Sequence, residues 1–264
     1  MRLALCQCPP GPDGPGGKLA RLREAARRAA AQGVDLLVFP EMYASGYNIG
    51  AARAAELAQD VGGPIAAGVA AIAREFDLGL LYGYPERNPA GKPYNSVQLI
   101  DRQGRRRANY RKTHLYGVID REQFSASDEP CAVFELEGWK LGLLICFDVE
   151  FPETVRRLAL EGADLVLVPT ANMHPYEFVA RTLVPARAYE NQVFLAYANY
   201  QGSEGGLEYV GLSGVAGPDG RMLAQGAPCA APSAQLVIAD LDRADLDRAR
   251  ADFSYLGARR PDLY

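Results

Sequence analysis

Three residues that could act together in catalysis follow three strand-like runs of this 264-residue sequence. Glu41 follows the run VDLLVFP, Lys112 follows ANYR, and Cys146 follows LGLLI. Strand ends at one rim of a sheet converge on a common pocket in open α/β folds. We therefore expect the three side chains to share a pocket.

A carboxylate, an ammonium and a thiol in one pocket suit acyl transfer through a thioester. Glu41 would take the proton of Cys146 as a general base, and the thiolate would attack a carbonyl carbon. Lys112 would stabilise the thiolate and the oxyanion that follows, with the backbone N–H of Phe147 as a second oxyanion donor. Each residue also has a structural interpretation: a buried thiol, a carboxylate at a helix start and a solvated ammonium. Spacing alone leaves both interpretations open.

The segments that must position these residues alternate between strand and helix patterns. Apolar runs and alternation predict strands at residues 2–8, 34–40, 78–84, 96–101, 105–111, 133–136, 140–145, 164–169, 193–200, 209–216, 221–223 and 234–241. Amphipathic patterns predict helices at residues 18–32, 51–76 with a break at 62–64, 152–161, 176–190 and 243–250. The strand at 2–8 is expected at a sheet edge. Interleaved elements with about a dozen strands indicate an α/β fold with two packed sheets.

The composition is that of a globular protein, and no linker or internal repeat divides residues 1–264 into domains. A formal net charge of −4 argues against binding to nucleic acid or to an anionic membrane. No window approaches the roughly 18 apolar residues of a membrane span, and the N-terminus lacks the pattern of a signal peptide. Five cysteines are few and odd in number, so we expect no disulfide framework and a reducing cytoplasmic location.

Other reactive residues have simpler explanations. Cys6 and Cys8 lie on one face of a strand, but no second Cys or His pair completes a zinc site, so we expect core packing and no metal. His114 is expected to brace its loop. Ser213 lies in GLSGV, which departs from the G-x-S-x-G nucleophile elbow at its last residue. The basic residues 105–107 lack a Gly-rich phosphate cradle and are expected on a solvated hairpin.

Three sequence blocks resemble the nitrilase superfamily of carbon–nitrogen hydrolases. They are FPEMYASGYNIG, YRKTHLYG and GLLICFDVEFPE, and the resemblance extends in order over essentially the whole chain. It implies a four-layer α-β-β-α sandwich and a catalytic triad of Glu41, Lys112 and Cys146. It also implies a homodimer or higher homo-oligomer. The chemistry expected from the triad needs no metal or organic cofactor.

A second carboxylate often assists the lysine in this superfamily. The residue eight positions after Lys112 is Asp120, with Glu122 as the alternative. Asp is one methylene shorter than the usual Glu at this place. The resemblance implies that this carboxylate orients Lys112 or the leaving ammonia, whereas a solvated loop residue is the alternative for Asp120.

Two further residues bear on the substrate. Many members of the superfamily carry an arginine where this chain has Glu150, and a glutamate reverses the charge offered to the substrate. We expect Glu150 to receive a cationic substrate tail, with a surface ion pair to Arg156 or Arg157 as the alternative. Asn172 is expected to line the pocket, with a helix N-cap as its alternative.

These observations predict an amidase that hydrolyses a small aliphatic amide. The blocks GYNIG, YGYPER and YNSVQLID resemble bacterial amidases that act on amides with an amino group, such as 5-aminovaleramide. An N-carbamoyl amide hydrolase and a nitrilase are the enzymatic alternatives. A catalytically silent binding protein with the same fold is the alternative from another class. The expected partner is a small-molecule amide.

Overall fold

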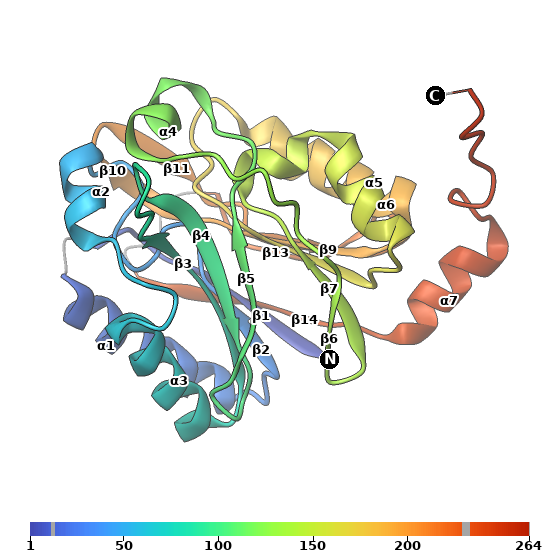
Figure 1. The fold of residues 1–264 in the computed structure, drawn as a ribbon. Helices are drawn as coiled ribbons and strands as arrows, with labels where there is room; N and C mark the ends of the chain where they lie inside the picture. The colour runs from blue at the N-terminus through green and yellow to red at the C-terminus, as the bar shows by residue number, and fades with distance from the viewer. Residues whose placement is uncertain (12–13, 229–232, 264) are drawn as a thin grey trace.

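The computed structural model describes residues 1–11, 14–228 and 233–263 (Figure 1). Within these residues the chain forms two six-stranded sheets and a separate hairpin. The first sheet contains, in spatial order, β14 (Gln235–Asp240), β1 (Arg2–Gln7), β2 (Leu36–Val38), β3 (Gly79–Glu86), β4 (Tyr94–Ile100) and β5 (Arg106–Arg111). The second contains β13 (Met222–Gln225), β12 (Gly214–Ala216), β9 (Phe194–Ala198), β8 (Leu165–Pro169), β7 (Trp139–Leu143) and β6 (Phe134–Leu136). Cys229 lies outside the described residues.

The described residues form seven α-helices besides the 3₁₀ and π-helical turns. They are α1 (Pro15–Ala30), α2 (Ala51–Leu57), α3 (Pro64–Phe76), α4 (Gly117–Gln123), α5 (Pro152–Leu160), α6 (Val184–Asn191) and α7 (Arg243–Asp252). Helices α1 and α3 cover the first sheet, α5 and α6 cover the second, and the segment after α7 extends away from the sandwich (Figure 1). The predicted α-β-β-α sandwich is confirmed.

The side chains of β1 alternate between two hydrophobic cores, one on each face of the first sheet. Along β1, Leu3 and Leu5 pack in the core that contains both sheets, whereas Ala4 and Cys6 pack in the core beneath α1 and α3. Successive side chains of a strand point to opposite faces, so an apolar residue at every position is buried on both sides. The same pattern explains why β2, β8 and β9 read as continuous apolar runs.

Several predicted elements differ from the observed ones. The segment predicted as an edge strand, β1, lies between β14 and β2, because the C-terminal strand β14 pairs antiparallel with its outer side. The predicted helix 176–190 is present as continuous helical backbone over residues 177–191, but Val179–Leu183 form a π-helical turn within it, since Pro185 cannot donate an α-helical backbone hydrogen bond. The predicted strand 209–216 divides into β11 (Leu207–Val210) and β12 at Gly211 and Leu212, which both have positive φ.

Two elements were not predicted from the sequence. They are the strand β10 (Gln201–Glu204), which pairs with β11 in the separate hairpin, and the helix α4. Helix α4 carries Asp120 and therefore belongs to the site described below. Among the described residues, no helix has the length and apolar character that crossing a membrane requires.

Candidate active site

Glu41, Lys112 and Asp120 meet in one buried cluster. The Lys112 ammonium donates a hydrogen bond of 2.7 Å to Glu41 Oε1 and one of 2.7 Å to Asp120 Oδ2. All three side chains have no exposed surface. Glu122, the alternative to Asp120, is exposed on the outer side of α4. The structure therefore places Asp120, and not Glu122, against the lysine.

Glu41 lies in a tight turn that follows β2 of the first sheet and contacts the second sheet. Its backbone N–H donates to the carbonyl of Thr170, just past the end of β8, at 3.3 Å. The next residue, Met42, has a φ of 52°, and the turn lies directly against Gly83 of β3. A Cβ on Gly83 would come 2.2 Å from the backbone nitrogen of Met42. Glycine at 83 is therefore what allows the Glu41 turn to approach the sheet.

Asn95 links the carboxylate and the ammonium. Its side-chain amide donates to Glu41 Oε1 at 2.6 Å, and its backbone carbonyl accepts from the N–H of Lys112 at 2.8 Å. Asn95 is fully buried in β4. The sequence analysis missed this residue, although a polar side chain in a strand that is otherwise largely apolar was a signal for it.

Cys146 lies at the turn that follows β7. It is the first residue of the 3₁₀ helix Cys146–Glu150 and has a φ of 47°. A non-glycine residue with positive φ is uncommon and occurs often at functional sites. As a residue Cys146 is partly exposed, in contrast to Cys6, Cys8 and Cys131, which are buried. The backbone N–H of Phe147 belongs to the first turn of this helix, where N–H groups lack intrahelical acceptors.

The electrostatics of the cluster favour a neutral thiol beside a proton acceptor. Burial raises the pKa of Cys146, and the Glu41 carboxylate raises it further, whereas Lys112 and hydrogen bonds from Thr170 and the Ala171 backbone lower it. Burial also raises the pKa of Glu41, against the opposing effect of Lys112. A thiol with a raised pKa needs a general base before it can attack.

Lys112 keeps its proton despite its burial. Burial alone would lower the pKa of Lys112, but the Asp120 and Glu41 carboxylates together raise it well above its ordinary value. The ammonium is therefore a permanent positive charge in the site. Glu41 Oε2 is buried and has no hydrogen-bond partner within the described part of the chain. Because buried polar atoms are normally paired, this oxygen is the acceptor available to a thiol proton or a substrate N–H.

Glu150 and Phe147 lie on the same 3₁₀ helix as Cys146. Burial raises the pKa of the half-buried Glu150, and the charges that lower it are those of Lys112 and Arg187. Arg157, one of its alternative partners, instead pairs with Glu161 at 2.7 Å. The Glu150 carboxylate therefore lies within electrostatic reach of the ammonium in the cluster.

Three aromatic rings lie together next to the Cys146 turn. The Tyr116 ring contacts the Phe147 ring edge-on at a centroid distance of 5.5 Å and the Tyr176 ring at 6.0 Å. Asn172 is buried, and its side-chain amide donates to the Tyr176 carbonyl at 2.9 Å. Asn172 thus braces the loop that carries Tyr176, and it does not cap a helix.

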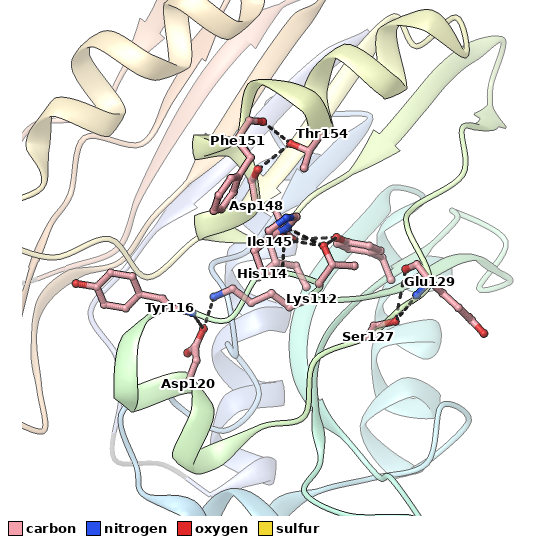
Figure 2. Close-up of polar contacts among 12 residues, drawn as sticks. Lys112, His114, Tyr116, Asp120, Ser127, Glu129, Ile145, Asp148, Phe151 and Thr154 are labelled. Carbon is pink, nitrogen blue, oxygen red and sulfur yellow. Dashed lines mark hydrogen bonds and ion pairs between the residues drawn. The ribbon is translucent and has the colours of Figure 1, made fainter. Parts of the chain in front are cut away.

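His114 does not contact the cluster. Its Nδ1 lies 2.9 Å from Asp148 Oδ1, and its ring stacks on Phe151 at 4.2 Å (Figure 2). It braces the loop after β5, as the sequence analysis expected. Among residues 1–11, 14–228 and 233–263, no group of three or more His, Cys, Asp and Glu side chains is arranged to hold a metal ion.

Sequence comparisons relate this chain to known proteins. Residues 2–251 match the sequence profile of the carbon-nitrogen hydrolase family. A protein named "Hydrolase in pqqF 5'region" from Pseudomonas protegens is 52% identical over 264 residues, which cover 100% of this chain and 90% of that protein. An (R)-stereoselective amidase from Pseudomonas sp. is 39% identical over 227 residues, covering 86% of this chain and 80% of the amidase.

Solved structures of an amidase from Nesterenkonia sp. have the same fold. One superimposes with a TM-score of 0.85 at 35% identity and covers 100% of this chain and 94% of the amidase. A mutant of that amidase superimposes with a TM-score of 0.84 at 34% identity, covering 100% and 98%. In this mutant structure, acrylamide has added to the active-site cysteine.

Proposed function

Because the chain belongs to the carbon–nitrogen hydrolase family, we propose that it hydrolyses a small aliphatic amide with an amino group to a carboxylic acid and ammonia. The observation that carries this proposal is the buried contact of Lys112 with Glu41 and Asp120 beside the partly exposed Cys146. A hydrolase of this family works on small amides through an active-site cysteine. The amino group on the substrate is proposed from the position of Glu150.

The reaction begins with proton transfer from the Cys146 thiol to Glu41. The thiolate attacks the amide carbon and forms a C–S bond, and the carbonyl electrons move to the oxygen. Lys112 and the Phe147 N–H stabilise this oxyanion. When the intermediate collapses, the C–N bond breaks, Glu41 returns the proton to the nitrogen, and ammonia leaves a thioester on Cys146.

Water completes the cycle. Glu41 takes a proton from the water, whose oxygen attacks the thioester carbon. The C–S bond then breaks to release the carboxylic acid, and Glu41 returns the proton to the Cys146 thiolate. The raised pKa of Glu41 matches this role, because a general base works best when its pKa lies near the pH at which the enzyme operates. Asp120 holds the ammonium of Lys112 in place through a second hydrogen bond of 2.7 Å.

The proposed selectivity for an amino group rests on Glu150. Its carboxylate is half-buried, interacts with the charge of Lys112 and also raises the pKa of Tyr116. An ammonium on the substrate tail would pair with Glu150 and lie against the rings of Tyr116 and Phe147, which attract cations. Asn172 contributes by holding the loop of Tyr176 against this wall.

A substrate panel with Cys146→Ala as control tests the proposal. We would measure ammonia release from 5-aminovaleramide, an amide of similar length with a terminal carboxylate, valeramide, an N-carbamoyl amine and a nitrile. We expect the amino-amide to be preferred and all activity to be lost in Cys146→Ala. Preference for the carboxylate-bearing amide would refute the role of Glu150, and activity in Cys146→Ala would refute the nucleophile. Carbon dioxide from the carbamoyl compound, or turnover of the nitrile alone, would identify one of the alternative enzymes.

The quaternary structure and the setting of the enzyme are part of the same proposal. We propose a single domain over residues 1–264 that forms a homodimer or higher homo-oligomer and works in a reducing cytoplasm without metal or organic cofactor. Phe178 and Tyr189 expose large aromatic rings beside and on α6, which suits association. Light scattering across a range of concentrations measures the oligomer, and a monomer throughout would contradict it.

A further inference from the structure

The Asp148 carboxylate lies between the loop after β5 and the turn after β7 (Figure 2). It is fully buried. Its Oδ2 accepts hydrogen bonds from the Tyr110 hydroxyl at 2.9 Å and from the Ile145 N–H at 3.0 Å. Its Oδ1 accepts from the Thr113 hydroxyl at 3.0 Å and from the His114 N–H at 2.9 Å, and the His114 ring nitrogen lies at the same distance.

These contacts reach the two chain segments that carry Lys112 and Cys146, which act together in the proposed reaction. Tyr110 and Thr113 stand on either side of Lys112 in the chain, and Ile145 directly precedes Cys146. Strand β5 belongs to the first sheet and β7 to the second. One carboxylate therefore joins the backbone that carries the ammonium to the backbone that carries the thiol, across the boundary between the sheets.

The contacts exceed what the local turn requires. At the start of the 3₁₀ turn, the only one of these bonds that the turn itself uses is the one that the Ile145 N–H donates to Asp148 Oδ2. The remaining donors come from β5 and the loop after it. The Tyr110 hydroxyl also contacts the Thr113 hydroxyl at 3.1 Å, and the Thr113 hydroxyl contacts the His114 ring nitrogen at 2.9 Å, so the carboxylate is the shared acceptor of one connected network. Networks of this kind select one arrangement of the groups they connect, because every partly satisfied alternative leaves buried polar atoms unpaired.

We propose that Asp148 is a positioning residue of the amide hydrolysis, holding the Lys112 strand end and the Cys146 turn at the separation that attack requires. This inference rests on the proposed function. Bound geometry matters strongly in such a reaction, because a displacement of about 1 Å can cost about a hundredfold in rate. Asp148 does not touch the reacting atoms; it acts through Lys112 and Cys146.

The first test is Asp148→Asn, which keeps the volume but replaces one acceptor oxygen with a donor NH₂ group. Both oxygens of Asp148 face donors, so the amide must break either the Ile145 side or the His114 side of the network. We expect kcat to fall about tenfold to a hundredfold while KM changes by less than about threefold. Asp164→Asn is the matched control, because Asp164 is also a buried aspartate but precedes β8, at the end opposite the site.

A second test removes two hydroxyl donors to the Asp148 carboxylate, those of Tyr110 and Thr113 on either side of Lys112. The double variant Tyr110→Phe, Thr113→Val should also lower kcat, and its effect should not add to that of Asp148→Asn, since both break the same connection. Thr154→Val is the control. The Thr154 hydroxyl contacts the backbone carbonyl of Asp148 at 2.7 Å and leaves the carboxylate network intact (Figure 2). We expect its kcat to match that of the wild type.

A substrate-free readout separates this inference from the proposed function. The rate of Cys146 alkylation by iodoacetamide, mapped by mass spectrometry, reports how accessible and how readily ionised the thiol is beside Lys112. We expect slower alkylation in Asp148→Asn than in the wild type at a temperature where both are folded. Wild-type kcat and wild-type alkylation in folded Asp148→Asn would overturn the inference. Slower alkylation in a protein that hydrolyses no amide would support the positioning role and refute the amidase.

Discussion

The Lys112 ammonium lies 2.7 Å from Glu41 Oε1, and both side chains are completely buried. Asp120 contacts the same ammonium from another side at 2.7 Å. A buried charge is tolerable only when it is paired and hydrogen-bonded, so each member of this cluster depends on the others. The arrangement keeps Lys112 protonated and leaves the second oxygen of Glu41 for the chemistry.

Replacing Glu41 with glutamine tests the general base directly. Glu41→Gln retains the shape of the side chain and an oxygen for Asn95 and Lys112, but it cannot take a proton from Cys146. We expect kcat for ammonia release to fall about 10²- to 10⁴-fold. Circular dichroism should show an intact fold. Activity within a few-fold of the wild type would show that another group deprotonates the thiol.

The pair Asp120→Asn and Glu122→Gln tests which carboxylate on α4 assists the lysine. Asp120→Asn removes one of two anions from the buried ammonium, so we expect loss of stability of about 3–5 kcal/mol and a large fall in kcat. Glu122→Gln changes an exposed side chain two residues away and should alter neither. Urea unfolding and steady-state kinetics on both variants measure this. A wild-type kcat in Asp120→Asn would mean that the contact of Asp120 with Lys112 does not matter to function.

His114 should make stability depend on pH. Its contact with Asp148 raises the pKa of His114, burial opposes this, Glu153 adds to the increase and Lys112 lowers it. Because the pKa is raised in the folded state, the stabilisation is fully present below the ordinary histidine pKa. It is lost as pH rises through the raised value. We expect the difference in unfolding free energy between wild type and His114→Gln to be larger at about pH 5.5 than at about pH 8.5. Chemical unfolding at both values measures it, and a constant difference would contradict the ion pair.

The residues that could be located from the sequence are those at the ends of strong local patterns. Glu41 and Cys146 each follow an apolar run and Lys112 follows a hairpin strand, and strand ends are visible in a single sequence. The structure places these three together because β2, β5 and β7 end near one another. Asp120 was located only by its spacing from Lys112, just beyond the resembling block YRKTHLYG.

Other parts of the molecule depend on long-range pairing that no local pattern contains. Asn95 touches Glu41 only because β4 and β5 pair in a register that brings its carbonyl to the Lys112 N–H. The interior position of β1 depends on β14, which lies more than two hundred residues later in the chain. Asp148 was part of a recognised block, but its role is visible only once two sheets are brought together.

The close approach of Gly83 to the Glu41 turn leads to a last prediction. In Gly83→Ala, the new Cβ would meet the Met42 nitrogen at 2.2 Å and the Glu41 carbonyl carbon at 2.9 Å, so backbone must move. We expect a loss of stability of about 1–3 kcal/mol, the usual effect of overpacking. Because Glu41 moves with the turn, kcat should fall about tenfold or more as well.

The same substitution at Gly16 is the matched control for Gly83→Ala. Gly16 lies in α1, and a Cβ there would meet nothing within 4 Å. Alanine is the better helix former, so Gly16→Ala should leave stability equal or slightly higher and kcat unchanged. Urea unfolding and ammonia release measured on both variants decide the matter. If Gly83→Ala loses stability but keeps the wild-type kcat, Glu41 holds its place independently of this contact, and the hydrogen bonds from Lys112 and Asn95 would be sufficient to position the base.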